Sequence, residues 1–186
     1  MPKKNIFSES LIFQKLKYKD KQAFGELYDH YVDDIYRFIF FRVNSKEDAE
    51  DLTSAVFLKT WNYFLENFHS EYNSLKPLIF KIARNAVIDH YRQARVKNNQ
   101  PLEQIRPEEL LDEQQDLDRK IDEGFQSDQI VKKISLLKEE FREILILKYI
   151  NDFSVKEISA IIDKPPGTVR VQIFRALKAL KEIMPN

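Results

Sequence analysis

The sequence contains no cysteine, which excludes disulfide bonds, cysteine-ligated zinc or iron–sulfur centres and cysteine nucleophiles. Only 3 glycines and 7 prolines occur in 186 residues, too few for the frequent chain reversals of an all-β fold. No apolar run approaches the roughly 20 residues that cross a bilayer, and the first residues lack an apolar segment of signal-peptide length. We therefore expect an all-α, cytoplasmic protein with no membrane insertion.

The formal net charge is zero, but the charges are unevenly distributed along the chain. Residues 1–97 hold 16 basic and 13 acidic side chains, residues 98–129 hold 3 and 10, and residues 130–186 hold 11 and 7. The middle stretch, with a net charge of −7, has apolar residues too scattered for a helical stripe and is typical of a solvated linker. The sequence predicts two small helical domains, 1–96 and 130–186, joined by an acidic linker, 97–129.

Two helices are predicted in the first half of the N-terminal domain. After Asp20, apolar residues recur at steps of three and four over 24–39, which predicts a helix that ends near Arg42. Asn44 or Ser45 is placed to cap a second helix, and the acidic residues that follow match its positive N-terminal dipole. The apolar face of this second helix is Leu52, Val56, Phe57, Thr60 and Trp61.

A third predicted helix begins near Pro77, a residue that the first helical turn tolerates. Residues 76–97 carry six lysines and arginines against a single acidic residue, Asp89. Positive charge gathered on one element is an electrostatic footprint for phosphate groups. This helix is therefore a candidate nucleic-acid-binding element.

The C-terminal domain ends in a predicted helix-turn-helix. Two helices are expected first, over 130–137 and 139–150. Ser154 and Glu157 then form a capping box that opens a short helix, and a break over 163–167 separates it from a second helix. A short amphipathic helix, a tight break and a basic helix are the elements of a DNA-binding helix-turn-helix.

The second helix of this motif has no acidic residue between Lys164 and Lys181. Four apolar positions are expected to face inward: Val169, Ile173, Leu177 and Leu180. Seven positions remain available to a major groove: Thr168, Arg170, Val171, Gln172, Phe174, Arg175 and Lys178. Arginine pairs with guanine and glutamine with adenine, and an exposed phenylalanine contacts thymine methyl groups. An ordinary bundle helix with a charged solvent face is the alternative, and the one-sided charge favours DNA binding.

Four segments together resemble the extracytoplasmic-function (ECF) group of bacterial sigma-70 family sigma factors. They are DAEDLTSAVFLKTW (48–61), FKIARNAVIDHYRQAR (80–95), FREILILKYINDFSVKEISAII (141–162) and PGTVRVQIFRALKAL (166–180). The resemblance implies a transcription-initiation subunit that is not an enzyme. Its first domain would bind core RNA polymerase and the minus-10 element of promoter DNA, and its second domain would bind the minus-35 element.

The resemblance also assigns candidate residues. The helix-turn-helix residues above fall on the minus-35 positions. The segment 66–76 and the helix after it match the element that opens the minus-10 region, with candidates Lys76, Lys81, Arg84, Asn85, Asp89, His90, Arg92 and Arg95. The polymerase-binding candidates are Asp48, Asp51, Leu52 and Phe57, although Phe57 and Trp61 are expected mainly to pack in the core. The chain departs from the family pattern at Ser54–Ala55, where Gln-Glu is usual, and at Gln172, where arginine is usual.

Two other functions fit parts of the sequence. A stand-alone helix-turn-helix regulator would explain only the last domain and leave the basic third helix without a role. A metal-dependent hydrolase would use His30, His69 and His90, but these lie on separate elements without the paired spacing of metal ligands. We expect no catalytic residue, no metal and no cofactor. An anti-sigma protein is a further partner that the resemblance allows.

Overall fold

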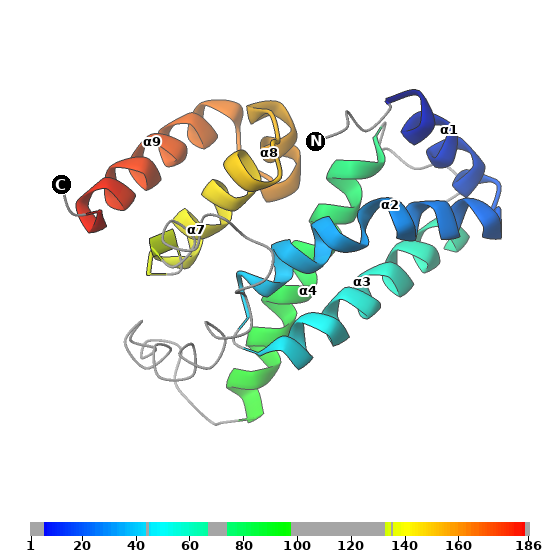
Figure 1. The fold of residues 1–186 in the computed structure, drawn as a ribbon, viewed down its shortest axis with the longest axis horizontal. Coiled ribbons are helices and arrows are strands. Elements are labelled where there is room, and N and C mark those ends of the chain that lie inside the picture. The colour runs from blue at the N-terminus through cyan, green and yellow to red at the C-terminus, as the bar shows by residue number, and fades with distance from the viewer. Residues whose placement is uncertain (1–5, 44, 67–73, 98–132, 135, 185–186) are drawn as a thin grey trace.

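A computed structural model describes residues 6–43, 45–66, 74–97, 133–134 and 136–184. The regular elements of these residues are all helical, as the composition predicts. In chain order they are α1 (Ile6–Lys17), α2 (Lys21–Phe40), α3 (Lys46–Glu66), α4 (Leu75–Lys97), α7 (Glu139–Leu145), the π-helical turn η2 (Ile146–Ile150), α8 (Val155–Ile162) and α9 (Pro166–Ile183). Figure 1 shows α1–α4 gathered on one side of the molecule and α7–α9 on the other.

Three sequence predictions lie partly or mostly outside the described residues. They are the acidic linker, the helix over 130–137 and the segment 66–76. Of the expected helix 130–137, Lys133 and Ile134 are helical, whereas Leu136 and Leu137 lie in a turn and a bend.

The starts of α2 and α3 are each set by a side-chain cap. Asp20 Oδ1 accepts hydrogen bonds from the backbone N–H groups of Gln22 and Ala23, at 2.8 and 3.3 Å. Ser45 Oγ accepts from the N–H of Asp48 at 3.0 Å. These side chains satisfy backbone donors that the first helical turn leaves without partners. Ser45, one of the two residues predicted to cap α3, is confirmed as its cap, and Asp20 caps α2 in the same way.

Helix α1 is absent from the sequence predictions, yet it holds the N-terminal half together. Its residues Phe13 and Leu16 are buried, and Phe13 packs edge-on against Phe64 of α3 with ring centroids 5.8 Å apart. The carboxylate of Glu9 accepts a hydrogen bond from the backbone N–H of Lys76 at 3.1 Å. Helix α1 therefore supplies a hydrogen-bond acceptor for a backbone N–H group in the first turn of α4, 67 residues away.

The C-terminal half departs from the predicted helix over 139–150. Regular α-helix ends at Leu145, and the next five residues form the π-helical turn, closed by a bond from the N–H of Asn151 to the carbonyl of Ile146 at 3.0 Å. Asp152 then adopts a left-handed conformation with φ of 61°, which aspartate tolerates better than most residues. The π-helical turn and the left-handed conformation of Asp152 together place Phe153 in a fully buried position.

The two halves are packed against each other along α4 and α8 (Figure 1). Phe80 of α4 and Phe153 lie edge to face, with ring centroids 4.7 Å apart and both side chains fully buried. Such a pair contributes roughly 0.5–1.5 kcal/mol beyond the area that it buries. The apolar core is consequently continuous from the N-terminal half into the C-terminal half.

Replacing Ser154 by alanine removes the capping box of α8, in which Ser154 Oγ accepts from the N–H of Glu157 and the Glu157 carboxylate accepts from the N–H of Ser154. We expect the free energy of unfolding to fall by about 1 kcal/mol. Urea denaturation followed by circular dichroism at 222 nm measures it. Ser54→Ala, on an exposed face of α3, is the matched control, and equal stability of the two variants would contradict the capping role.

Tyr91→Phe removes a hydrogen bond from the Tyr91 hydroxyl to the carbonyl of Arg42 (2.5 Å), and we expect a loss of about 1 kcal/mol at pH 7. Burial raises the pKa of Tyr91 from 10.0 to about 12. Since the folded state favours the neutral phenol, its stabilisation is present below pH 10 and lost as the pH rises toward 12.

The measurement is the difference in unfolding free energy between wild type and Tyr91→Phe at pH 7 and at increasing alkaline pH. We expect this difference to shrink above pH 10. Tyr149→Phe, at a tyrosine that is 56% exposed, is the control and should leave the stability unchanged at both ends of the range. A pH-independent difference for Tyr91→Phe would refute the burial of its phenol.

Candidate nucleic-acid interface

The candidate DNA-contacting helix α9 is set against α8 by a short, hydrogen-bonded turn. Asp163 ends α8 in a left-handed conformation with φ of 53°. Ser159 closes the turn twice, because its hydroxyl donates to the carbonyl of Lys164 at 2.6 Å and its carbonyl accepts from the Lys164 N–H at 3.2 Å. Helix α9 begins directly afterwards at Pro166, so the helical break is shorter than the predicted 163–167.

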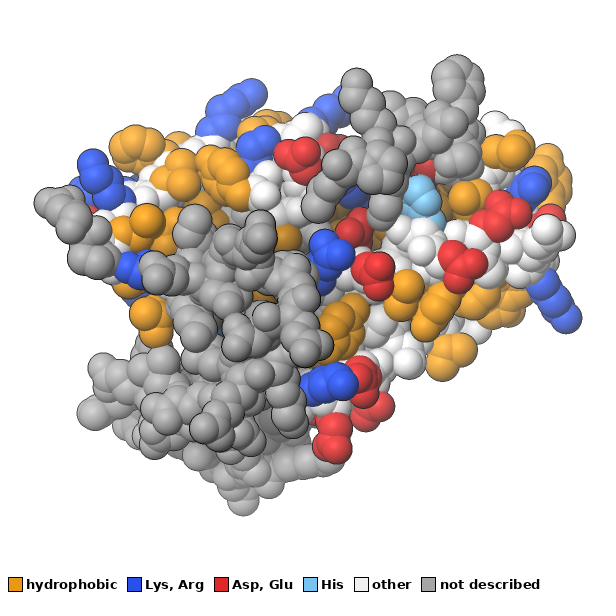
Figure 2. All heavy atoms as spheres, viewed as in Figure 1, with side chains coloured by type: hydrophobic (Ala, Val, Ile, Leu, Met, Phe, Trp, Pro, Cys, Tyr) orange, Lys and Arg blue, Asp and Glu red, His pale blue; other side chains and the backbone are white. Residues whose placement is uncertain are grey.

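The outer face of α9 carries most of the predicted groove residues. Val169 and Ala176 are fully buried against the rest of the C-terminal half, and Phe174 on the opposite face is 70% exposed. Figure 2 shows basic and hydrophobic side chains exposed together over α9. The exposed candidates are Thr168, Arg170, Val171, Phe174, Arg175 and Lys178, whereas Gln172 is half-buried.

The predicted inward position of Leu177 is wrong. Leu177 is 40% exposed, and Ala176 takes the buried position instead. At 100° per residue, Ala176 lies about 20° from Val169 around the helix, whereas Leu177 lies about 80° away. The smaller side chain therefore faces α7 and α8, and a leucine remains on the side of the helix beside Phe174.

Three of the eight minus-10 candidates contact the C-terminal half instead of lying free on α4. The Lys81 ammonium pairs with Asp163 at 2.7 Å, and the Arg84 guanidinium pairs with Glu143 at 3.0 Å. The ammonium of Lys76 donates to the carbonyl of Asn151 at 2.9 Å. No local pattern in the sequence indicates these contacts.

The other minus-10 candidates divide between solvent and α3. Asn85 and Arg92 are exposed. Asp89 lies 4.0 Å from the ammonium of Lys59, and His90 Nε2 lies 3.8 Å from a carboxylate oxygen of Asp48. Arg95 belongs to α4, but its side chain is outside the described residues. The described side chains among these candidates thus do not lie together on one exposed surface.

The polymerase-binding candidates of α3 have different environments. Phe57 is buried beside Tyr28, with ring centroids 4.7 Å apart, which confirms that its main role is in the core. Asp48 exchanges hydrogen bonds with Ser45, as expected for a residue at a helix N-terminus. Leu52 is half-buried, and the carboxylate of Asp51 is exposed to solvent.

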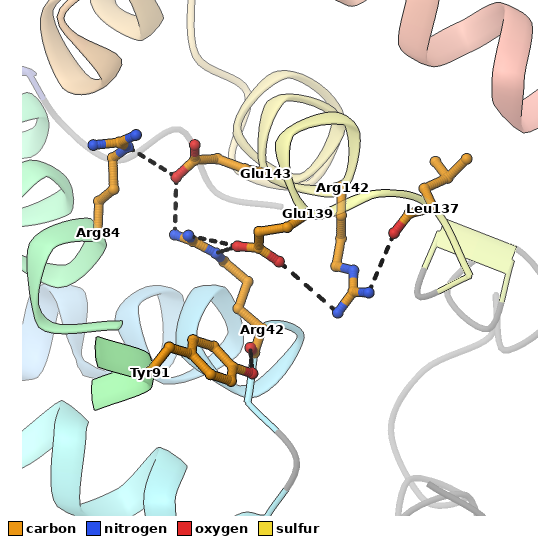
Figure 3. Close-up of polar contacts among 7 residues, drawn as sticks. All are labelled: Arg42, Arg84, Tyr91, Leu137, Glu139, Arg142 and Glu143. Carbon is orange, nitrogen blue, oxygen red and sulfur yellow. Dashed lines mark hydrogen bonds and ion pairs between the residues drawn. The ribbon is translucent and has the colours of Figure 1, made fainter. Parts of the chain in front are cut away.

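Arg42 is the interface residue that sequence reasoning missed. It follows α2, its side chain is only 2% exposed, and its guanidinium contacts two carboxylates of α7, those of Glu139 and Glu143 (Figure 3). Its partners lie about a hundred positions further along the chain, so charge patterning over a local window cannot identify them. The one feature of the sequence that points to Arg42 is its position directly after the apolar stripe of α2.

Neither a metal site nor a membrane span is found in the part of the chain that the structure describes. No group of three or more histidine, aspartate or glutamate side chains lies close enough there to bind a metal, and His69 is outside this part. Each described helix is too short or too polar to cross a bilayer.

Comparison with protein families accounts for both halves of the chain. Residues 27–96 match the family described as Sigma-70 region 2, and residues 127–180 match Sigma-70, region 4. The first match gives the N-terminal half a role that a stand-alone helix-turn-helix regulator would leave unexplained.

Known proteins resemble the chain along most of its length. The probable RNA polymerase sigma-C factor of Mycobacterium bovis is 30% identical over 148 residues, which are 79% of this chain and 75% of that protein. The ECF RNA polymerase sigma factor SigW of Bacillus subtilis is 27% identical, covering 91% and 92% of the two chains. The ECF RNA polymerase sigma factor BldN of Streptomyces coelicolor is 28% identical over 170 residues, which are 90% of this chain and 62% of BldN.

Solved structures share the fold. The sigma factor RpoE of Bartonella quintana, solved with the anti-sigma factor NepR, has a TM-score of 0.66 at 21% identity and covers 87% of this chain and 96% of RpoE. CnrH, solved with the cytosolic domain of CnrY, has a TM-score of 0.66 at 17% identity, covering 95% and 96%. The two matched regions and the sequence similarity to known sigma factors show that the chain belongs to the extracytoplasmic-function group of sigma-70 family RNA polymerase sigma factors.

Proposed function

We propose that the N-terminal half of this sigma factor binds core RNA polymerase and the minus-10 element, and that the C-terminal half binds the minus-35 element. The observation that carries the proposal is the outer face of α9, where Thr168, Arg170, Phe174, Arg175 and Lys178 are exposed on a helix with no carboxylate between Lys164 and Lys181. A helix of this kind after a tight turn is the recognition element of a helix-turn-helix.

Different side chains on α9 supply different parts of recognition. Arg170 and Arg175 present guanidinium groups that pair bidentately with guanine in the major groove. Phe174 and Val171 are exposed apolar groups suited to thymine methyl contacts. Thr168 lies in the first turn, where its hydroxyl and the free backbone N–H groups favour a phosphate oxygen. These α9 side chains therefore combine contacts to the DNA phosphates, which position the helix, with contacts to base edges, which read the sequence.

On α4, the exposed Asn85 and Arg92 are the side chains that we assign to minus-10 contacts without any rearrangement of the chain. Lys76, Lys81 and Arg84 belong to the same basic helix but are held by the C-terminal half. We assign them to DNA contacts in the transcription complex. A DNA strand with extruded bases requires cations along its phosphate backbone, and these side chains supply them.

The partners follow from these surfaces. Core RNA polymerase would contact α3 through the exposed Asp51 and the half-buried Leu52. An anti-sigma protein is a further proposed partner, as it is for RpoE of Bartonella quintana. The chain would act in the cytoplasm, on the polymerase and its promoters, and would catalyse no reaction itself.

Association with polymerase is the direct test of this function. We expect the purified chain to co-migrate with sigma-free core polymerase on a sizing column and to initiate transcription from a fragment library. Asp51→Lys should weaken core binding at least about tenfold, because it reverses an exposed charge in the proposed contact. Asp29→Lys, an equal change on the exposed surface of α2, is the control. Equal core binding by the two variants would contradict the assignment of α3.

Arg175 tests the recognition helix. With a duplex that carries the minus-35 element recovered from the library, Arg175→Ala should lower affinity roughly 5- to 150-fold, the range for one bidentate base contact. Arg175→Lys keeps the charge but loses the planar fork, so it should lose most of the sequence preference while it keeps non-specific affinity. Wild-type discrimination by either variant in fluorescence anisotropy would refute the role of Arg175 in base recognition.

A further inference from the structure

A basic corner joins α1 to α2, at the end of the N-terminal half that lies away from α9 (Figure 1). Residues 15–21 read KLKYKDK, with four lysines and one aspartate in seven positions. The carboxylate of that aspartate, Asp20, accepts the two hydrogen bonds that cap α2. The four lysines and the tyrosine between them are called the corner patch below: Lys15, Lys17, Tyr18, Lys19 and Lys21.

The ammonium groups of the corner patch are not neutralised by carboxylates in the described part of the chain. Two of them are exposed and two are half-buried, and none forms an ion pair there. Lys46 and Lys59 of α3, by contrast, lie beside the carboxylates of Glu50 and Asp89. Four like charges within seven residues raise the local positive potential, so the corner patch attracts an anionic partner.

An aromatic ring lies among these cations. Tyr18 is 78% exposed, the largest exposed fraction among the large apolar and aromatic side chains that the structure describes. Its backbone is fixed one residue after α1 by a bond from its N–H to the carbonyl of Lys15 at 3.0 Å. Sites for single-stranded nucleic acid combine cations that bind phosphates with aromatic rings on which bases stack. The corner patch contains both components.

The backbone of the corner is strained at Lys19. This residue adopts a left-handed conformation with φ of 61°. The turn is held by bonds from the Lys19 N–H to the carbonyl of Leu16 at 2.9 Å and from the Asp20 N–H to the carbonyl of Lys15 at 3.2 Å. Glycine adopts this conformation without steric cost, whereas lysine does not. The chain therefore has a cation at a position where glycine would fold with less strain, which favours a role in binding.

The corner patch is also close to the start of α4, the helix assigned to minus-10 contacts. The hydrogen bond between the Glu9 carboxylate and the Lys76 N–H, at 3.1 Å, fixes α1 beside that start. From Glu9 to Lys17, α1 advances eight residues, or about 12 Å. Phosphates follow one another along a strand every few ångströms. A strand held by α4 therefore reaches the corner patch within a few nucleotides.

We propose that the corner patch binds single-stranded promoter DNA next to the segment held by α4. Its lysines bind phosphates, and Tyr18 stacks on an unpaired base. The corner patch is then a third DNA contact, in addition to α4 and α9. The inference rests on the proposed function, because it takes α4 as the helix that holds the melted minus-10 strand.

The first experiment locates DNA in the complete transcription complex. Because the sequence has no cysteine, Gln22→Cys at an exposed position beside the corner patch takes a photo-activated crosslinker on a single thiol, before assembly with core polymerase. With a promoter fragment recovered from the library, we expect a crosslink to one DNA strand within the melted region. Ser54→Cys, at an exposed position of α3, is the control and should give no crosslink to DNA.

The second experiment measures the affinity of the polymerase complex for the same promoter fragment. The variant that combines Lys17→Gln, Lys19→Gln and Lys21→Gln should bind promoter at least about fivefold more weakly, with a salt dependence reduced by about three phosphate contacts. Its binding to core polymerase should equal that of wild type. The control removes the same charge at exposed lysines outside the proposed contacts: Lys46→Gln, Lys138→Gln and Lys156→Gln.

Two single substitutions separate DNA binding from folding. Lys19→Gly removes both the charge and the left-handed strain, so promoter affinity should fall about twofold or more while the thermal unfolding midpoint stays the same or rises. Tyr18→Ala should lower promoter affinity about fivefold or more, as expected for the loss of one stacked base, and Tyr18→Phe should keep it. Circular dichroism measures the unfolding midpoints.

A crosslink from Gln22→Cys to polymerase subunits alone would overturn the DNA assignment and identify an acidic surface of the polymerase as the partner. Equal promoter affinity and salt dependence in the lysine variant and its control would show that the corner patch is only a solvated surface. Failure of the proposed function is distinguishable from both results, because wild type would then neither bind core polymerase nor initiate transcription. The inference is supported only when the DNA crosslink and the loss of promoter affinity occur together.

Discussion

The arrangement of the two halves depends on the neutralisation of one buried guanidinium. A charge as inaccessible as that of Arg42 is costly unless carboxylates lie within hydrogen-bond distance. Glu139 and Glu143 are four positions apart on α7, so both project from the same face of that helix toward Arg42. This requirement determines which face of α7 meets the N-terminal half, and Phe153 extends the contact onto α4.

Much of the local structure could be predicted because its causes lie within a few residues. The cap at Ser45 and the capping box of Ser154 and Glu157 each join residues three positions apart. The stripe on α2 and the basic outer face of α9 follow from helical periodicity alone. The family resemblance rested on the same segments, and the matches to Sigma-70 regions 2 and 4 confirm it.

The features that could not be predicted depend on tertiary contacts. Helix α1 lacks a strong amphipathic pattern, and Glu9 acquires its role only when α4 begins beside it. The π-helical turn is stabilised by the burial of Phe153 against Phe80, which the residues of the turn do not indicate. Lys76, Lys81 and Arg84 were identified by charge, but their partners come from another part of the chain. A basic residue in a sequence has no assigned partner until the fold supplies one.

The exposed apolar side chains of α9 have a thermodynamic consequence. In the free protein, Val171, Phe174 and Leu177 keep hydrocarbon surface in water on one side of a helix that also carries arginines. Water around such surface has a high heat capacity, and removal of this water lowers the heat capacity of the system. Recognition through these side chains therefore makes the enthalpy of DNA binding depend on temperature, whereas the phosphate contacts mainly make the affinity depend on salt.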